Sequence, residues 1–159
     1  MRLRTHYVFT MGVLFPLGVN VSPLQGIVMA GILSVASNLI IDRLGHEVRW
    51  GYVRRTPMTH TLPRSVMWGF LPALFIFLLL YFSGVVLWAV PLMGLLSGPS
   101  HLLLDIFTER GIYVKKKGRW SRFALAHFRY DNPMVNLLAV LAGLGIIILT
   151  LYVRGVLLV

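Results

Sequence analysis

Five long apolar stretches separated by polar loops are the feature that most constrains this chain. They run over residues 7–21, 24–41, 65–82, 85–107 and 134–153. A membrane-spanning helix needs about 20 apolar residues, within a range of about 17 to 25, and the last four stretches meet this requirement. The first is short and contains a proline, which membrane helices tolerate better than soluble ones. We therefore predict an all-α integral membrane protein with about five transmembrane helices, forming a single membrane domain over residues 1–159.

The composition supports a membrane protein rather than a soluble one. Hydrophobic residues make up 57% of the chain and charged residues 13%, which leaves too little polar surface for a soluble domain of 159 residues. The N-terminal sequence MRLRTHYVFT is basic and precedes an apolar run, as in a signal peptide. No small-residue cleavage site with a polar region follows it, so we interpret it as the start of a retained first span.

The basic residues are concentrated in three segments. The N-terminal tail, the loop 42–64 and the loop 108–133 contain 14 of the 15 Lys and Arg residues. With five spans these segments fall on one side of the membrane, and the positive-inside rule places that side in the cytoplasm. We therefore expect a multi-pass protein of the cell membrane, with its N-terminus and basic loops in the cytoplasm and its C-terminus outside.

The titratable residues follow the same distribution. All five acidic residues and all five histidines lie in these three segments or at their membrane edges. The chemistry is therefore expected at the cytoplasmic membrane surface. The net charge of +10 fits basic loops beside anionic lipid headgroups better than it fits nucleic-acid binding. We expect membrane lipids as partners, not nucleic acid, and the sequence leaves a homo-oligomer open.

The second basic loop contains a hairpin pattern. In IYV-KKKG-RWSRF, two β-rich runs that carry aromatic residues lie on either side of a Lys-Gly pair. Such runs around a short turn with glycine indicate a β-hairpin. We therefore predict one short β-hairpin in this loop.

The motif GPSHLLLDIFTERG, at the end of the fourth apolar stretch, carries the strongest chemical signal. His101 and Asp105 are four residues apart and so share one face of a helix. This spacing lets one helix give a metal two ligands, or one ligand and the carboxylate that orients it. The chain has no cysteine, so His, Asp and Glu are the remaining strong metal ligands. The alternative is a His–Asp hydrogen bond that only joins helices.

A second group lies where the second apolar stretch meets its loop. Asn38, Asp42 and His46 repeat every four residues and line one face if the helix continues that far. This arrangement predicts Asp42 as a ligand and His46 as a further one. The alternative is a salt bridge from Asp42 to Arg43 or Arg49, with His46 in solvent.

The segment RRTPMTHTLPRS carries a third group. Prolines on both sides of Thr-His-Thr restrict the backbone, so His60 is held in a rigid loop. Arg54 and Arg55 are expected to face an anionic substrate, because guanidinium groups match phosphate oxygens. His6 and His127 each lie near a membrane edge, where either could complete a site.

The order of these motifs resembles a known family. A Thr-His opens the first apolar stretch, an Asp closes the second, Thr-His-Thr follows, and His-x-x-x-Asp comes before a Thr and a Gly. This order resembles the YdjM-like membrane-bound metal-dependent hydrolases, described as LexA-binding and inner-membrane-associated, and is most similar to an archaeal branch. That family is in turn similar to zinc-dependent phospholipase C and P1-type nucleases. The resemblance covers residues 5–111 and implies metal ligation by His6, Asp42, His60, His101 and Asp105.

The chain departs from the family pattern at two places. Where the family usually has Pro-Asp-x-Asp-His, this chain has Ile-Asp-Arg-Leu-Gly-His over residues 41–46. The second Asp is missing, so a second metal would need His46 or Glu47 as a substitute. Arg-Arg-Thr-Pro over residues 54–57 replaces the His-Arg-Gly that usually precedes Thr-His-Ser.

These observations predict a metal-dependent hydrolase at the cytoplasmic membrane surface, acting on a phosphoester such as a lipid headgroup. It would hold one or two divalent ions, zinc first, with manganese or magnesium as alternatives. Asp105, Asp42 or Glu47 would act as the base. The predicted metal ligands are His6, Asp42, His46, His60, His101 and Asp105, with His127 as a possible additional ligand, and the predicted substrate-binding residues are Arg54, Arg55, Lys115, Lys116 and Lys117.

Two other classes remain open at this point. A metal- or lipid-binding membrane scaffold without turnover would keep the same ligands. A small proton or cation transporter would use His101 and Asp105 as a relay, which requires a polar path through the membrane. The outer halves of the apolar stretches lack charge, so the transporter ranks last.

Overall fold

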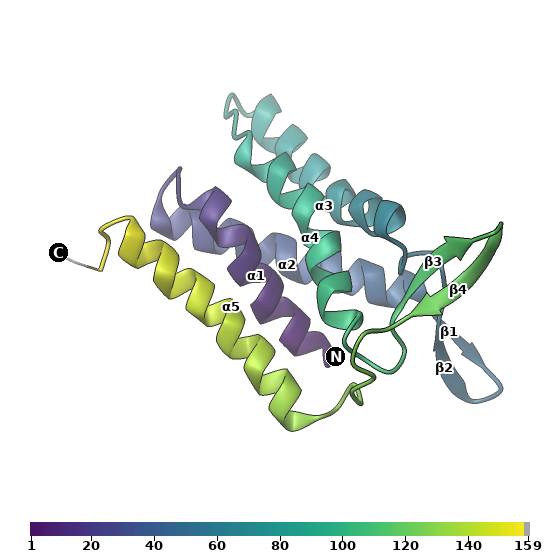
Figure 1. Ribbon diagram of the computed structural model, residues 1–159. Helices are drawn as coiled ribbons and strands as arrows, with labels where there is room; N and C mark the ends of the chain where they lie inside the picture. Colours follow the sequence, from purple (N-terminus) through teal and green to yellow (C-terminus); the bar gives the residue numbers. More distant parts are fainter. Residues whose placement is uncertain (158–159) are drawn as a thin grey trace.

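The computed structural model describes residues 1–157, and within them five helices and two short β-hairpins follow one another along the chain (Figure 1). This confirms the prediction of a mostly helical protein. The helices are α1 (Leu3–Gly18), α2 (Pro23–Gly45), α3 (Leu62–Phe82), α4 (Ala89–Asp105) and α5 (Pro133–Val153). One hairpin pairs β1 (His46–Arg49) with β2 (Tyr52–Arg55), and the other pairs β3 (Ile112–Lys116) with β4 (Arg119–Phe123).

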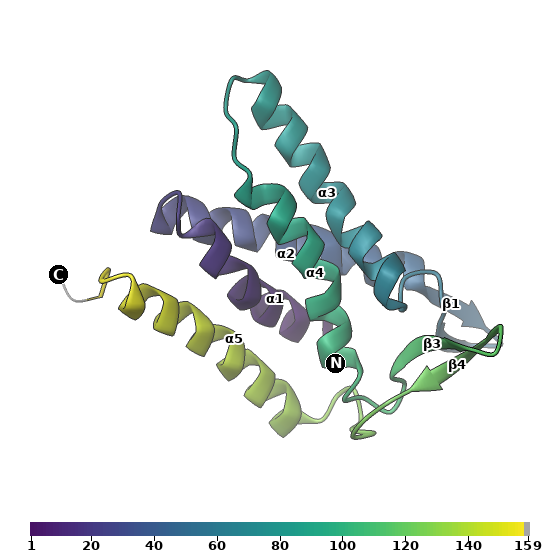
Figure 2. The same cartoon turned by 45° about the horizontal axis from the view of Figure 1, so that its top comes forward.

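Helices α1 and α4 pack against each other at the centre of the bundle. Helix α5 packs on α1, α3 packs on α4, and α2 contacts α1, α3 and α4. Helices α1, α3 and α5 begin at the end where α2 and α4 finish, and both hairpins extend from this end (Figures 1 and 2). We call it the polar end, and the opposite end of the bundle the apolar end.

Three of the helices, α2, α3 and α5, are long and apolar enough to cross a membrane. The expectation of about five spanning helices is not supported for the other two. Helix α1 has 16 residues and α4 has 17. At about 1.5 Å per residue these lengths fall short of a hydrocarbon core of about 30 Å. Both helices also bury polar side chains inside the bundle.

Several boundaries differ from the predicted ones. Helix α1 begins at Leu3, earlier than predicted, so His6 lies within the helix. Helix α2 continues to Gly45 and α3 begins at Leu62, which shortens the predicted loop 42–64 at both ends. Helix α4 begins at Ala89, four residues after the predicted start. Hydrophobicity does not mark these ends, because polar residues extend α1, α2 and α3 beyond the apolar runs, whereas the apolar residues 85–88 lie outside α4.

The hairpin predicted in the second basic loop is present, with β3 and β4 antiparallel. Its two-residue turn, Lys117 and Gly118, has φ angles of +47° and +79°. Trp50 and Gly51 form the turn of the β1–β2 hairpin, with φ angles of +54° and +80°. Positive φ at both central positions is the type I′ pattern, whose twist matches the strands. The β1–β2 hairpin was not predicted from the sequence, because a tryptophan at the first turn position is a weak turn signal.

The apolar end holds the main hydrophobic core. Leu14, Phe15, Leu33 and Met93 are almost fully buried there and come from α1, α2 and α4. The turn between α1 and α2 is tight, because a Cβ atom on Gly26 would lie 2.6 Å from the backbone carbonyl carbon of Gly18. Close helix approach through small residues is the usual way in which membrane helices pack. The core of this end is therefore held together by apolar packing.

Candidate metal centre

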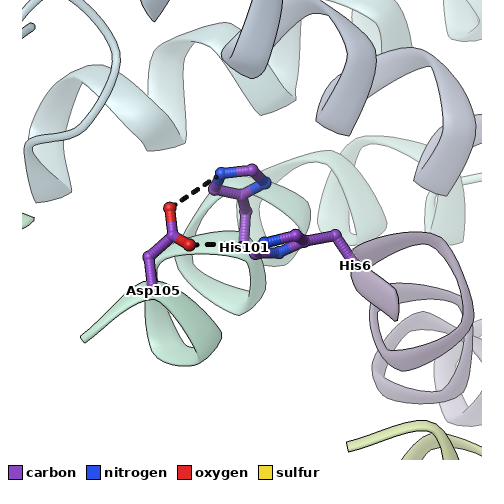
Figure 3. A group of neighbouring side chains, drawn as sticks. All are labelled: His6, His101 and Asp105. Atoms are coloured by element: carbon purple, nitrogen blue, oxygen red, sulfur yellow. Dashed lines mark ion pairs between the residues drawn. The ribbon is translucent and has the colours of Figure 1, made fainter. Parts of the chain in front are cut away.

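Histidine and aspartate side chains from four segments converge at the polar end. His6 comes from α1, Asp42 from the last turn of α2, and His60 from the loop before α3. His101 and Asp105 come from the last two turns of α4. Figure 3 shows the Asp105 carboxylate directed at the rings of both His101 and His6. Segments far apart in the sequence thus form one cluster.

Asp105 lies at the centre of this cluster and is fully buried. Its Oδ2 atom is 3.2 Å from His101 Nε2 and 3.5 Å from His60 Nε2. Its Oδ1 atom accepts a hydrogen bond of 2.6 Å from the guanidinium of Arg55. One carboxylate oxygen therefore has a cation beside it, whereas Oδ2 has no hydrogen-bond partner.

Asn38 fixes the proton on His101. The Asn38 amide nitrogen donates to the Ser34 carbonyl, so its oxygen faces His101 Nδ1 at 2.7 Å. This oxygen accepts only, so Nδ1 carries the proton and donates it. Nε2 is then the basic nitrogen, and it has no hydrogen-bond partner. A second residue that fixes the tautomer in this way is characteristic of metal-ligating histidines.

Thr59 does the same for His60. The Thr59 hydroxyl donates to the Ile41 carbonyl at 2.8 Å, which uses its only proton. Its oxygen can then only accept from His60 Nδ1, 2.9 Å away. Burial lowers the pKa of His60 to about 2, so the ring is neutral at physiological pH. His60 Nε2 is therefore also an unprotonated nitrogen without a hydrogen-bond partner.

Asp42 completes the group from the solvent side. Its Oδ1 atom is 3.5 Å from His101 Nε2 and 3.9 Å from His60 Nε2. His46 Nδ1 lies 3.8 Å from the same oxygen, and burial lowers the pKa of this half-buried histidine. The side chain of Asp42 is 18% exposed, whereas Asp105 is fully buried, so Asp42 connects the cluster to solvent.

With both rings neutral, four electron-pair donors face one another at this point. They are two imidazole nitrogens and two carboxylate oxygens, and such atoms repel one another unless a cation lies among them. The four nitrogen–oxygen separations between them range from 3.2 to 3.9 Å. In a tetrahedral zinc site with bonds of about 2.0 to 2.1 Å, ligand atoms are about 3.3 Å apart. The donor set and its spacing therefore fit one divalent ion.

His6 forms a second, overlapping ligand group with His101 and Asp105. Its ring stacks on that of His101, with centroids 4.0 Å apart. His6 Nε2 is 3.3 Å from Asp105 Oδ1, the oxygen that Arg55 already neutralises. A second ion on that oxygen would be repelled by the guanidinium. The geometry thus favours one ion on the Oδ2 side, with His6 beside it.

The comparison with family models gives one match. Residues 1–104 match the model of a family described as protein of unknown function (DUF1286). The chain belongs to this family. No curated protein and no solved structure matches the chain. The DUF1286 match includes His6, Asp42, His60 and His101, and it ends one residue before Asp105.

Arg55 has a different environment from the one predicted. It was expected to face a substrate, but its guanidinium is buried and pairs with Asp105. It also donates to the Thr108 hydroxyl and the Gly111 carbonyl. Arg55 therefore fixes and neutralises Asp105 first. It also borders two clefts, so a role toward substrate stays a prediction.

Other predicted site residues lie outside the cluster. His127 is exposed, and neither candidate ligand group in residues 1–157 includes it. Glu47 is exposed on β1 and borders a cleft with Trp120 and Arg64. The three lysines predicted to bind substrate, Lys115, Lys116 and Lys117, are exposed at the tip of the second hairpin. They line none of the described clefts.

The sequence reasoning missed residues that orient the ligands. Asn38 was noted on the face of Asp42 and His46, yet it was not assigned a role toward His101. Its spacing of four residues from Asp42 was the available signal. Thr59 precedes His60 directly, and its hydroxyl orients the His60 ring because it is itself bonded to the Ile41 carbonyl near the end of α2. Arg110 was missed altogether, since only the fold brings it beside the cluster.

Proposed function

We propose that this protein is a membrane-bound metal-dependent hydrolase that acts on a phosphoester at the cytoplasmic membrane surface. The observation that carries the proposal is the convergence of four potential ligand atoms from Asp42, His60, His101 and Asp105. Each histidine is oriented by a residue behind it, which a merely structural His–Asp contact does not require.

Zinc is the metal that best suits these ligands, with manganese or magnesium as alternatives. Two nitrogens and two oxygens at these separations match the usual zinc coordination. An ion bound by all four of these ligands has no open position, so Asp42, the partly exposed one, would have to yield its place to water. The ion would then supply Lewis acidity, polarising the scissile group and lowering the pKa of water to near neutral. Asp42 and His46 both border the adjoining cleft, so they are the residues placed to take a proton there. Asp105 is enclosed and positions the histidines.

The cleft beside Asp42 suits a phosphoester with an apolar part. It has a volume of about 430 Å³ and is lined by Asp42, His46 and three arginines on one part of its wall. Leu3, Val53 and Tyr130 form an apolar part of the same wall. Arginine forks bind phosphate oxygens, whereas the apolar residues would contact an acyl or alkyl group. A lipid phosphoester therefore fits this cleft, and membrane lipids are the proposed partners.

We place α2, α3 and α5 across the cell membrane, with α1 and α4 completing a five-helix bundle. The polar end, which carries 14 of the 15 basic residues, would face the cytoplasm. The C-terminus would lie outside. This orientation puts the candidate metal centre at the depth of the lipid headgroups. The convergence of five positions also supports our proposal that the family is related to the YdjM-like hydrolases.

Metal analysis tests this proposal directly. The purified protein in detergent is expected to contain one zinc or manganese ion per chain. His101→Ala and Asp105→Ala are expected to lose it, because each removes a central ligand. His127→Ala is the matched control, since it removes an exposed histidine outside the cluster, and it should retain the metal. A screen of phosphomonoesters and phosphodiesters with the metal-loaded protein then tests for hydrolysis.

A second measurement covers the case in which the two alanine variants fail to fold. Added zinc should raise the free energy of unfolding of the wild type by about 2.7 kcal/mol when the free metal is 100 times its dissociation constant. Thermal unfolding in detergent measures this increase. No metal in the wild type, and no stabilisation by zinc, manganese, nickel or iron, would overturn the proposal. Stabilisation by metal without hydrolysis of any phosphoester would favour the non-catalytic scaffold.

A further inference from the structure

A second cleft, lined mainly by arginine, adjoins the one beside the candidate metal centre. It lies between the two hairpins, has a volume of about 230 Å³, and contains no acidic residue in its wall. Arg55 and Arg110 border both clefts, so the two share a wall. The lining residues of this arginine pocket are Val53, Arg54, Arg55, Arg110, Tyr113 and Arg122.

Three of these arginines lack a carboxylate partner. Among the side chains that the structure describes, which exclude those of residues 49 and 52, the ion pairs of arginine join Arg55 to Asp105 and Arg129 to Asp131. Arg54, Arg110 and Arg122 form none. Gathering guanidinium groups around one cleft is unfavourable unless an anion or solvent offsets the repulsion. The pocket is therefore electrostatically suited to an anionic group.

Hydrogen bonds hold the walls of the arginine pocket in place. The Tyr113 hydroxyl donates to the Arg55 carbonyl at 2.9 Å, and the Tyr113 backbone N–H donates to the His60 carbonyl at 2.8 Å. Arg122 lies opposite Tyr113 in the β3–β4 ladder. The Nε–H of Arg55 is buried and has no hydrogen-bond partner, although the rest of its guanidinium is bonded. One buried donor beside the pocket is thus left for a ligand.

We propose that the arginine pocket is a second anion subsite, and that the protein selects substrates with two adjacent phosphate groups, such as diphosphate esters. This inference rests on the proposed function for the first subsite. One phosphate group would lie in the cleft beside Asp42, and the next would lie across the shared wall among Arg54, Arg110 and Arg122. Two adjacent clefts that share two arginines offer a separate place for each phosphate group of a diphosphate.

Binding of inorganic phosphate and inorganic pyrophosphate to the zinc-loaded protein tests this inference. By calorimetry in detergent at low salt, pyrophosphate is expected to bind at least about tenfold more tightly, since it adds charge-assisted hydrogen bonds. Arg122→Gln and Arg54→Gln should each weaken pyrophosphate binding by about tenfold and leave phosphate binding nearly unchanged. Both residues are exposed, so the fold should tolerate these changes.

Arg119→Gln is the matched control, because Arg119 is an exposed arginine on the same strand as Arg122 but does not line the pocket. It should retain the preference for pyrophosphate. Equal binding of the two anions by the wild type would overturn the inference. So would a loss of pyrophosphate binding in Arg119→Gln as large as that in Arg122→Gln, since general surface charge would then explain it.

The same titrations without added metal separate this inference from the proposed function. If the chain binds no metal, the arginine pocket should still prefer pyrophosphate, and Arg122→Gln should still abolish that preference. If the chain binds metal but shows no preference, the second subsite fails while the metal centre stands. A diphosphate ester of a long-chain alcohol in lipid nanodiscs then identifies the source. Tighter binding than pyrophosphate supports a lipid diphosphate, and equal binding supports a free one.

Discussion

The two ends of the helical bundle are stabilised in opposite ways. At the apolar end, buried Leu, Phe and Met side chains pack against one another, and glycines let the helices approach closely. This packing needs no bound ligand or ion. At the polar end, the Nε2 atoms of His60 and His101 face two carboxylates and have no hydrogen-bond partner. The comparison teaches that the apolar end stabilises the bundle, whereas the polar end costs free energy unless a cation is present. Substitutions at the two ends should therefore differ in how their effects depend on metal.

Arg55→Met is expected to have the largest effect. It leaves the buried Asp105 carboxylate without its guanidinium partner, and breaking a buried ion pair in this way costs about 3 to 5 kcal/mol. Thermal unfolding in detergent measures the loss, and added zinc should recover part of it. Arg129→Met is the control, because its pair with Asp131 is largely exposed and should cost below about 1 kcal/mol. Equal losses in the two variants would contradict the role given to Arg55.

Gly26→Ala is the corresponding change at the apolar end. The added Cβ would overlap the backbone of Gly18 and Val19, and the overpacking should cost about 1 to 3 kcal/mol. The loss should be the same with and without zinc. Gly145→Ala serves as its control, since no atom lies within 4 Å of the new Cβ, and it should stabilise its helix by about 0.5 to 1 kcal/mol. A zinc-dependent loss in Gly26→Ala would break the contrast between the ends.

Asn38→Leu sharpens the comparison within the polar end. It keeps the volume of a fully buried side chain but removes the oxygen that holds His101 Nδ1–H. Metal affinity should fall about 10- to 100-fold, as is usual when a residue that orients a ligand is lost. Competition with a chromogenic chelator measures this affinity. Asn20→Leu, at an exposed position of the apolar end, should leave it unchanged, and a similar fall there would refute the tautomer argument.

Asp42→Asn should give the smallest change in the stability of the metal-free protein, and one of unusual sign. An amide N–H could donate to the basic nitrogen of His101 or His60, so the metal-free protein should gain about 1 kcal/mol. The same variant should lose most of its metal affinity. The variant should therefore be more stable than the wild type without zinc and less stable than the wild type with zinc, which unfolding curves under both conditions measure. Destabilisation without metal would show that the donors at the polar end do not repel one another.

The sequence predicts the helices well and their lengths less well. Apolar runs locate all five helices, because burial and lipid exposure both select hydrophobic residues. The run 7–21 already indicates a short α1, whereas the run 85–107 overestimates α4, because the apolar residues 85–88 and 106–107 lie outside the helix. The β3–β4 hairpin follows from its Lys-Gly turn. Trp50 and Gly51 form an equivalent turn that was not predicted, because tryptophan is not a typical turn residue.

The candidate ligands could be predicted because their spacing is local. His101 and Asp105 share one helix face, and that geometry follows from the helix itself. The partners of these residues could not be predicted, since Asn38 reaches His101 and Arg55 reaches Asp105 only through packing of separate segments. For the same reason the arginine pocket, which Arg110 and Arg122 complete from a later loop, has no signature in the sequence.

The wide separation of the ligands along the chain has a consequence for biogenesis. His6 is synthesised roughly 100 residues before Asp105, which at about 5 to 20 residues per second is a delay of roughly 5 to 20 seconds. During this interval His6 on α1 lacks the Asp105 carboxylate that lies beside it in the folded protein. The metal centre can close only when α4 joins the bundle. Metal uptake would thus report that α4 has joined α1 and α2, a step that does not require α5.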